Sequence, residues 1–340
     1  MFSMKFILLL PIFALVLISG CVIPSGINPF DSNTPAGTGV VIEDFSPDFQ
    51  TVYSGEEVKF TLKVKNTGSV KAEDGFAELL GLDQIWIRGE NPLAQVNKGN
   101  EVFPDETRCR YTDKKITLLP EEPEAGITGG EDTCTWRYIA PPVLTGLSVN
   151  SKPRVRFYYT YKSSTIKTVT LVPREELKAI HDQGKGLPTE SYSTTKSPVS
   201  IGIETASPIR TYGNSVEFPV VITLKNIGGG TVCTDKSENC KKSGGVIITS
   251  ELPQWNRLKI NIILPDGLDI ANGSCKEEDE KIVFTGKDPQ TISCIIVAKD
   301  VYKQIGVIQK NIEVTAQYGY FIDKTSDITV YPSNQPSANK

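Results

Sequence analysis

The chain contains the same domain-sized segment twice, and this duplication constrains the fold more than any other feature of the sequence. The segment Lys65-Asn66-Thr67-Gly68 recurs as Lys225-Asn226-Ile227-Gly228, 160 residues later. The same offset separates Cys134 from Cys294. A period this long indicates two copies of a whole domain, because the units of solenoid repeats are only about 20–50 residues long.

Each copy contains stretches in which apolar and polar residues alternate. The clearest stretch runs from Val58 to Lys65, with apolar side chains at Val58, Phe60, Leu62 and Val64. The matching stretch of the second copy carries Val216, Phe218, Val220, Ile222 and Leu224. A period of two is typical of a β-strand with one buried face and one face in water.

The end of each copy has the same period. One face carries Val155, Phe157, Tyr159 and Tyr161 in the first copy, and Val314, Ala316, Tyr318 and Tyr320 in the second. A polar stretch, a short apolar strand and a proline follow in both copies. This pattern predicts a β-hairpin that closes each copy. Asn66 and Asn226, each two residues before a glycine, are predicted to adopt positive φ in a turn.

Short strands with turn signals and little helical periodicity predict an all-β fold. We expect two tandem immunoglobulin-like antiparallel β-sandwiches joined by a short helical linker. The helix is predicted over residues 173–181, because Pro173 stands near its start and Gly184 follows its end. The predicted ranges are 40–174 for the first sandwich, 175–197 for the linker, 198–332 for the second sandwich and 333–340 for a disordered tail.

The N-terminus has the features of an export signal. Lys5 precedes an apolar run from Phe6 to Leu17, which is too short to span a bilayer comfortably. The run ends at Ile18-Ser19-Gly20-Cys21, which resembles the lipobox of prokaryotic lipoproteins. The resemblance implies cleavage after Gly20 and a diacylglyceryl group on Cys21. An ordinary signal peptide with a chance cysteine is the alternative.

This resemblance predicts a signal peptide over residues 1–20 and a flexible tether over 21–39. Two acyl chains hold a protein on a membrane stably. The mature protein is therefore expected to be membrane-anchored and to face the extracellular or periplasmic side.

Six cysteines remain besides Cys21, and an even number in an exported chain favours three disulfides. Their positions in the two copies pair Cys109 with Cys134 and Cys275 with Cys294. Cys233 and Cys240 lie in a polar insert of the second copy and are expected to pair with each other. A cysteine-only metal site is the alternative, but the sequence has no C-x-x-C pair.

Three segments of the first copy resemble CARDB-type domains, which are immunoglobulin-like modules of archaeal and bacterial surface proteins. These segments cover residues 41–47, 55–60 and 64–68. The resemblance covers the first half of each copy best, whereas the cysteines and long inserts depart from the family pattern. It implies extracellular scaffolding or adhesion and carries over no catalytic residue.

Composition excludes several other classes of function. The single histidine, His181, removes most histidine-based zinc sites and most Ser-His or Cys-His catalytic sets. It falls in the linker, where a solvated position is expected. The net charge of −4 without a basic stripe argues against a nucleic-acid partner. No cofactor and no metal site are predicted.

Two acidic segments and one sequon are the remaining candidate sites. The insert over residues 120–132 and the run Glu277-Glu278-Asp279-Glu280 could gather calcium, but both lack the ordered ligand spacing of a calcium loop. Solvated acidic loops are the favoured interpretation. Asn272-Gly273-Ser274 fits the N-glycosylation pattern, which makes Asn272 a candidate modification site on a surface turn.

The leading functional prediction is a non-enzymatic cell-surface lipoprotein that acts as an extracellular scaffold, adhesion or binding module. Its expected partners are a membrane, through the lipid anchor, and envelope or surface proteins or glycans. A glycan-binding protein is one alternative, with Trp86, Trp136 and Trp255 as candidate stacking platforms. A hydrolase that uses paired carboxylates is a further alternative, because that chemistry needs no histidine.

Overall fold

The computed structural model describes residues 39–82, 85–88, 115–242, 255–275, 282–284, 288–300 and 306–333. These parts are mostly β-strand, and the predicted all-β fold of two antiparallel sandwiches with a helical linker is confirmed. The strands of the first repeat are β1 (Val40–Pro47), β2 (Thr51–Tyr53), β3 (Glu57–Asn66), β4 (Ala72–Leu80), β5 (Ile87–Arg88), β6 (Ile116–Leu118), β7 (Glu131–Ile139), β8 (Val149–Ser151) and β9 (Arg154–Pro173).

The linker and the second repeat contribute the remaining elements. The linker holds helix α1 (Arg174–Asp182) and strand β10 (Tyr192–Thr194). The second repeat holds β11 (Val199–Thr205), β12 (Ile209–Thr211), β13 (Ser215–Asn226), β14 (Thr231–Thr234), helix α2 (Ser237–Lys242), β15 (Arg257–Leu258), β16 (Asn261–Ile263), β17 (Leu268–Ile270), β18 (Ile282–Val283), β19 (Gln290–Lys299), β20 (Ile308–Thr325) and β21 (Ile328–Tyr331). A short 3₁₀ helix, η3 (Pro123–Ala125), lies in the first repeat.

Each repeat builds one four-stranded sheet with the same strand order. The order is β1-β3-β7-β5 in the first repeat and β11-β13-β19-β17 in the second. The predicted alternation is confirmed, because Val58, Phe60, Leu62 and Val64 of β3 are buried and the matching residues of β13 are buried too. These buried faces form one layer of each sandwich.

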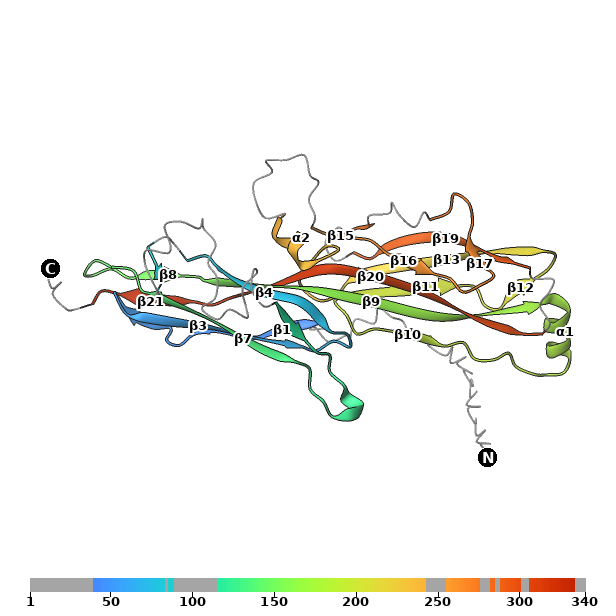
Figure 1. Cartoon of the computed structure of the whole chain (residues 1–340), viewed down its shortest axis with the longest axis horizontal. Helices are drawn as coiled ribbons and strands as arrows, with labels where there is room; N and C mark the ends of the chain where they lie inside the picture. Colours follow the sequence, from blue (N-terminus) through green and yellow to red (C-terminus); the bar gives the residue numbers. More distant parts are fainter. Residues whose placement is uncertain are drawn as a thin grey trace, which may run out of the picture.

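The opposite layer is a single sheet that both repeats share. Strands β9 and β20 pair antiparallel along their whole length, from Arg154 opposite Thr325 to Leu171 opposite Ile308. A strand of 20 residues spans about 65 Å at roughly 3.3 Å per residue. The two strands therefore run side by side through both sandwiches, as Figure 1 shows.

The predicted hairpin at the end of each copy is wrong, because the repeats exchange these segments. Strand β9 continues without a turn to Pro173, where its last residues pair in parallel with β12 of the second repeat. Reciprocally, β21 follows β20 and pairs with β2 and β8 of the first repeat. The ranges 40–174 and 198–332 thus delimit the sequence repeats, whereas each sandwich contains strands from both.

Buried hydroxyl groups explain why the polar stretch of β9 is a strand and not a turn. Ser163 and Thr165 point into the interior and are nearly inaccessible. The Ser163 hydroxyl donates to the carbonyl of Val199 (2.7 Å), and the Thr165 hydroxyl donates to that of Ile201 (2.7 Å). These bonds satisfy carbonyls on β11, so the polar side chains continue the inward face set by the tyrosines.

The pairing of β9 with β20 places an approximate two-fold axis at its centre. Thr160 and Gly319 occupy matching positions of the two repeats, and they pair directly with each other. Accordingly Tyr159 lies opposite Tyr320, and Tyr161 lies opposite Tyr318. All four tyrosines are at most 1% exposed. A residue that faces its own counterpart is the sign of an isologous contact, here formed within one chain.

These tyrosines explain the Lys-Asn-x-Gly motif of the repeats. The hydroxyl of Tyr161 accepts a bond from the backbone N–H of Val70, and that of Tyr320 accepts one from Gly230, the equivalent residue. A Cβ atom on Gly68 would lie 2.0 Å from the Tyr161 hydroxyl, and one on Gly228 would lie 2.7 Å from that of Tyr320. Glycine is therefore required for steric reasons in both copies.

The predicted positive φ at Asn66 and Asn226 is wrong, although both residues do act in turns. They end β3 and β13, and neither is among the described residues with positive φ. Each side-chain amide instead donates across the following turn, from Asn66 to the carbonyl of Val70 (2.8 Å) and from Asn226 to that of Gly230 (2.9 Å). The amide group shapes the turn without a strained backbone.

The predicted linker helix is confirmed as α1, which begins just after Pro173 and is followed by Gly184 at a φ of 65°. His181 is exposed on it, as expected. From α1 the chain returns along β9 as β10 and reaches β11 at the centre of the molecule. Within the described ranges, no helix has the length and apolar character needed to cross a membrane.

Candidate functional site

Two of the three predicted disulfides lie within the described residues, and both are present. Cys233–Cys240 and Cys275–Cys294 are bonded, each with Cα atoms 5.2 Å apart. Cys134 is disulfide-bonded as well, and its predicted partner Cys109 lies outside the described residues. In an exported protein such bonds stabilise the folded chain.

The insert of the second repeat begins at the centre of the molecule. Asp74 of β4 and Asp235, one residue beyond the position that matches Asp74, both have positive φ (54° and 63°). In the first repeat the chain continues along the sheet after this bulge. In the second repeat it leaves the sheet, forms α2 and returns at Trp255. The insert therefore begins close to the point where β4 of the first repeat has its bulge.

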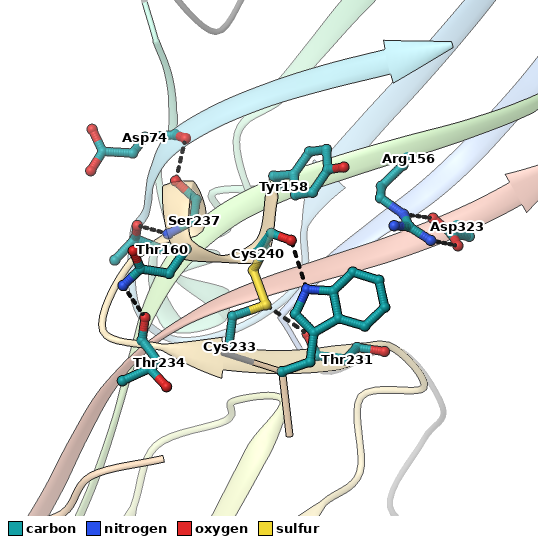
Figure 2. The surroundings of a disulfide bond; sticks show 12 residues. Asp74, Arg156, Tyr158, Thr160, Thr231, Cys233, Thr234, Ser237, Cys240 and Asp323 are labelled. Carbon is teal, nitrogen blue, oxygen red and sulfur yellow. Dashed lines mark hydrogen bonds and ion pairs between the residues drawn. A yellow bond between two sulfur atoms is a disulfide. The ribbon is translucent and has the colours of Figure 1, made fainter. Parts of the chain in front are cut away.

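The insert covers the outer face of the shared sheet and touches both repeats. The Cys233–Cys240 bond, Phe76, Tyr158 and Phe321 form a small buried cluster that Trp255 packs against. The rings of Phe76 and Tyr158 stack with centroids 4.5 Å apart. Arg156 lies over the Phe321 ring at 4.0 Å. It also binds both carboxylate oxygens of Asp323 (2.7 and 2.8 Å) (Figure 2).

Polar contacts fix α2 to the first repeat. The backbone N–H of Ser237 donates to the hydroxyl of Thr160 (3.0 Å), and the Ser237 hydroxyl donates to the carbonyl of Asp74 (3.1 Å) (Figure 2). Lys241 pairs with Glu78 of β4 (3.0 Å). The insert thus acts as a strap across the central seam between the two repeats.

The tryptophans are structural, which leaves little support for a glycan platform. Trp86 and Trp136 are 3% and 0% exposed, so neither offers a face for stacking. The half-buried Trp255 packs against Phe321 with centroids 5.1 Å apart, and its indole N–H donates to the carbonyl of Cys240 (2.6 Å).

Two carboxylates of the acidic insert of the first repeat pair with lysines. Glu121 pairs with Lys196, and Glu131 pairs with Lys63 (2.9 Å) and Lys65 (2.7 Å). These lysines lower the pKa of Glu131 to about 2. In the residues that the structure describes, no cluster of three or more metal-binding side chains occurs. The second acidic run, 277–280, lies outside the described residues.

Asn272 lies on an exposed turn, in the position that a glycosylation site requires. Gly273 follows it with a φ of 80°, and the hydroxyl of Ser274 accepts a hydrogen bond from the backbone N–H of Ile295 (2.6 Å). The Asn272 side chain is accessible while its turn is fixed to β19.

Sequence reasoning missed an apolar surface at one end of the molecule. Its residues, here called the repeat-1 tip, are Phe49, Tyr53, Leu144, Leu147 and Tyr331. Leu144 and Leu147 are 76% and 61% exposed. Tyr53 pairs with Tyr331, and the loop that holds the leucines is bound to the adjacent turn by a bond from Val143 N–H to the Ser54 hydroxyl (2.8 Å). In the sequence, the two leucines that flank Thr145-Gly146 are the feature that could have indicated this exposed apolar loop.

The opposite end of the molecule has a different surface. There α1 packs against β9 and β12, and it presents exposed charged side chains, including Arg174, Glu175 and Lys178. Tyr212, which directly follows β12, is 70% exposed. The repeat-1 tip has no such helix over it in the described part of the chain (Figure 1).

The first described residues lie midway between the two ends. Gly39 accepts a hydrogen bond from Thr67 N–H (2.7 Å), and a Cβ atom on it would meet Pro198 and the Tyr159 hydroxyl. This position adjoins the central tyrosines. Cys21 and the rest of the predicted signal and tether lie outside the described residues, as does most of the predicted tail.

Comparison with protein-family models finds no match, and comparison with curated proteins finds none. Solved structures with partial likeness include Salmonella alpha-2-macroglobulin reacted with methylamine (TM-score 0.21, 9% identity) and native E. coli alpha-2-macroglobulin (TM-score 0.18, 8% identity). Each match covers 87% of this chain and 23% of the macroglobulin chain. The Enterococcus faecalis MSCRAMM ACE matches with a TM-score of 0.11 and 9% identity, over 86% of this chain and 95% of its own. These likenesses are too slight to carry an argument.

Proposed function

We propose that this protein is a non-enzymatic cell-surface lipoprotein of CARDB-like type that acts as a scaffold or binding module. The lipobox-like sequence supports anchoring through Cys21 to a membrane, on its extracellular or periplasmic side. The expected partners are this membrane and envelope or surface components.

The observation that carries the proposal is the interlocked body. Two sandwiches share β9 and β20, and the strap with its Cys233–Cys240 bond crosses their seam. A large stapled core of this kind suits a rigid part that holds its shape outside the cell. Its surfaces, and not an internal site, are then the parts that meet partners.

The position of Gly39 supports a scaffold that is attached at its middle and not at one end. A tether that enters at one end would produce a stalk, whereas here it enters at the middle. The body therefore lies across its anchor and presents two different ends.

The test is the intact mass of the protein extracted from membranes of its native host, before and after reduction. Loss of residues 1–20, a diacylglyceryl adduct and a mass gain of six hydrogens on reduction are expected. In the Cys21→Ser variant the protein should leave the membrane fraction on alkaline washing, or remain as the uncleaved precursor. A native protein that retains residues 1–20 and carries no adduct would refute the anchoring.

A further inference from the structure

The repeat-1 tip is a group of exposed apolar side chains at one end of the molecule. Phe49 is 66% exposed and Tyr53 49%, in addition to the two leucines of the neighbouring loop. Apolar side chains gathered at one end of a molecule mark an interaction site more often than scattered ones do. The surrounding charges are mixed, with Asp48, Glu57 and Arg137 among them, so electrostatic recognition does not explain the site.

We propose that the repeat-1 tip inserts into the lipid bilayer that carries the anchor, an inference that rests on the proposed function. Leucine and phenylalanine side chains enter the acyl boundary of a bilayer, and tyrosines suit the headgroup level. The tip carries both kinds in one place, with Tyr53 beside Tyr331 and the leucine loop attached to the same turn.

The length of chain before Gly39 favours the bilayer as the occupant. As a flexible coil, the predicted tether of 18 residues from Val22 to Gly39 would reach roughly 20–25 Å. From Gly39 the body extends to the tip along the ten-residue strand β3, which covers about 30 Å. The distance from Gly39 to the tip is therefore similar to the distance from Gly39 to the membrane surface. A body that is held at its middle can rest one end on the bilayer without stretching the tether.

The difference between the two ends shows which of them docks. Both ends are about equally far from Gly39, because β3 and β13 each reach from one end of the molecule to its centre. The far end of the second repeat carries Tyr212 but also the charged surface of α1, which opposes insertion. The contact is therefore expected at the repeat-1 tip alone, and the body tilts toward it.

The test places a tryptophan at each end of the full-length chain, as Leu147→Trp and, for the matched control, Tyr212→Trp. Each acylated protein is reconstituted into phosphatidylcholine vesicles whose acyl chains carry bromine, and the added fluorescence is compared with the wild type. Quenching of the tryptophan at 147 and full intensity of the one at 212 are expected. Adding Leu144→Asp to Leu147→Trp should abolish the quenching.

Equal intensity at both ends would overturn the proposal. So would a blue shift at 147 without quenching, because that outcome places the tip against a second copy or another protein segment. Flotation of the same vesicles reports the anchor independently. Protein that floats with an unquenched tip refutes only the docking, whereas protein that fails to float refutes the proposed function.

Discussion

The two repeats have the same sheet order but differ in what covers them at the centre and at the ends. After β14 the second repeat leaves the sheet and forms the disulfide-bonded strap, whereas the first repeat continues along β4 there. The second repeat ends under α1, whereas the first ends in the exposed repeat-1 tip. A duplicated body has therefore become a molecule with one reinforced seam and two unlike ends.

The edge strands show the same divergence on a smaller scale. The edge of β1 has a bulge between Ile42 and Asp44, and Lys324 donates to the carbonyl of Glu43 (2.8 Å). The equivalent edge of β11 is instead capped by hydroxyl groups, with Thr165 and Tyr192 both donating to the carbonyl of Ile201. Both devices occupy carbonyls that would otherwise be open to pairing with another chain.

The largest expected effect is a loss of stability at alkaline pH, and it tests whether the two repeats unfold together. Burial raises the pKa of Tyr161 to about 12 and raises those of Tyr159, Tyr318 and Tyr320 as well. The unfolded tyrosines ionise near pH 10, so the folded state holds more protons above that pH. These four tyrosines therefore do not change stability below about pH 10 and lower it above that pH, by up to roughly 5 kcal/mol per pH unit while all four stay protonated.

Tyrosinate absorbance and circular dichroism followed together through alkaline titration measure this loss. The buried tyrosines of both repeats should ionise in one step that coincides with unfolding. Two separate steps would show that each repeat protects its own pair.

Removing each disulfide in turn compares how much stability the bond in the strap and the bond between Cys275 and Cys294 each contribute. Chain entropy alone assigns about 2.5 kcal/mol to the loop closed by Cys233–Cys240 and about 3.3 kcal/mol to the one closed by Cys275–Cys294. The structure predicts the reverse order, because Cys233 and Cys240 also hold the strap on Phe76 and Tyr158. Melting temperatures of the two double-alanine variants decide the order, and a larger loss for Cys275 and Cys294 would contradict the role of the strap.

Thr160 and Gly319, which face each other at the approximate axis, both contact the strap and test its contribution there. A Cβ atom on Gly319 would lie 2.2 Å from the carbonyl oxygen of Lys236, so Gly319→Ala should displace the strap and cost about 1–3 kcal/mol. Thr160→Ser keeps the hydroxyl that accepts from Ser237 N–H and removes only one buried methyl group, about 1 kcal/mol. Denaturant midpoints of the two variants test this, and equal costs would mean that the strap does not press on Gly319.

The smallest predicted effect is a difference in stability between variants of two equivalent tyrosines, Tyr159 and Tyr318. The Tyr318 hydroxyl bonds the Val199 N–H (3.1 Å) and the Ser163 hydroxyl (2.8 Å). The Tyr159 hydroxyl has no partner of hydrogen-bonding geometry among the described residues. Tyr318→Phe should therefore cost about 1 kcal/mol, and Tyr159→Phe clearly less. Chemical denaturation measures both, and a larger cost for Tyr159→Phe would reverse the assignment.

Local patterns in the sequence predict the strands well and the connections between repeats poorly. Alternation identifies β3 and β13 with the correct buried faces, and the duplication pairs the cysteines. The same patterns cannot distinguish a hairpin within a copy from exchange between copies, because both bury Tyr159 and Tyr161 on one face. Ser163 and Thr165 look like turn residues until their acceptors on β11 are known.

The surfaces were less predictable than the core. The burial of Trp86 and Trp136 depends on contacts distant in sequence, as does the neutralisation of Glu131 by Lys63 and Lys65. The repeat-1 tip depends on β21 returning to β2, which no local signal reveals.

Native-state hydrogen exchange in the Ile222→Ala variant tests most directly whether the exchanged strands join both sandwiches into one folding unit. Ile222 is fully buried in the second sandwich, and its truncation should cost about 2–5 kcal/mol. If the two sandwiches form one unit, the most protected amides of β3, in the other sandwich, lose the same opening free energy as those of β13. Unchanged protection of β3 would show that the two sandwiches unfold independently.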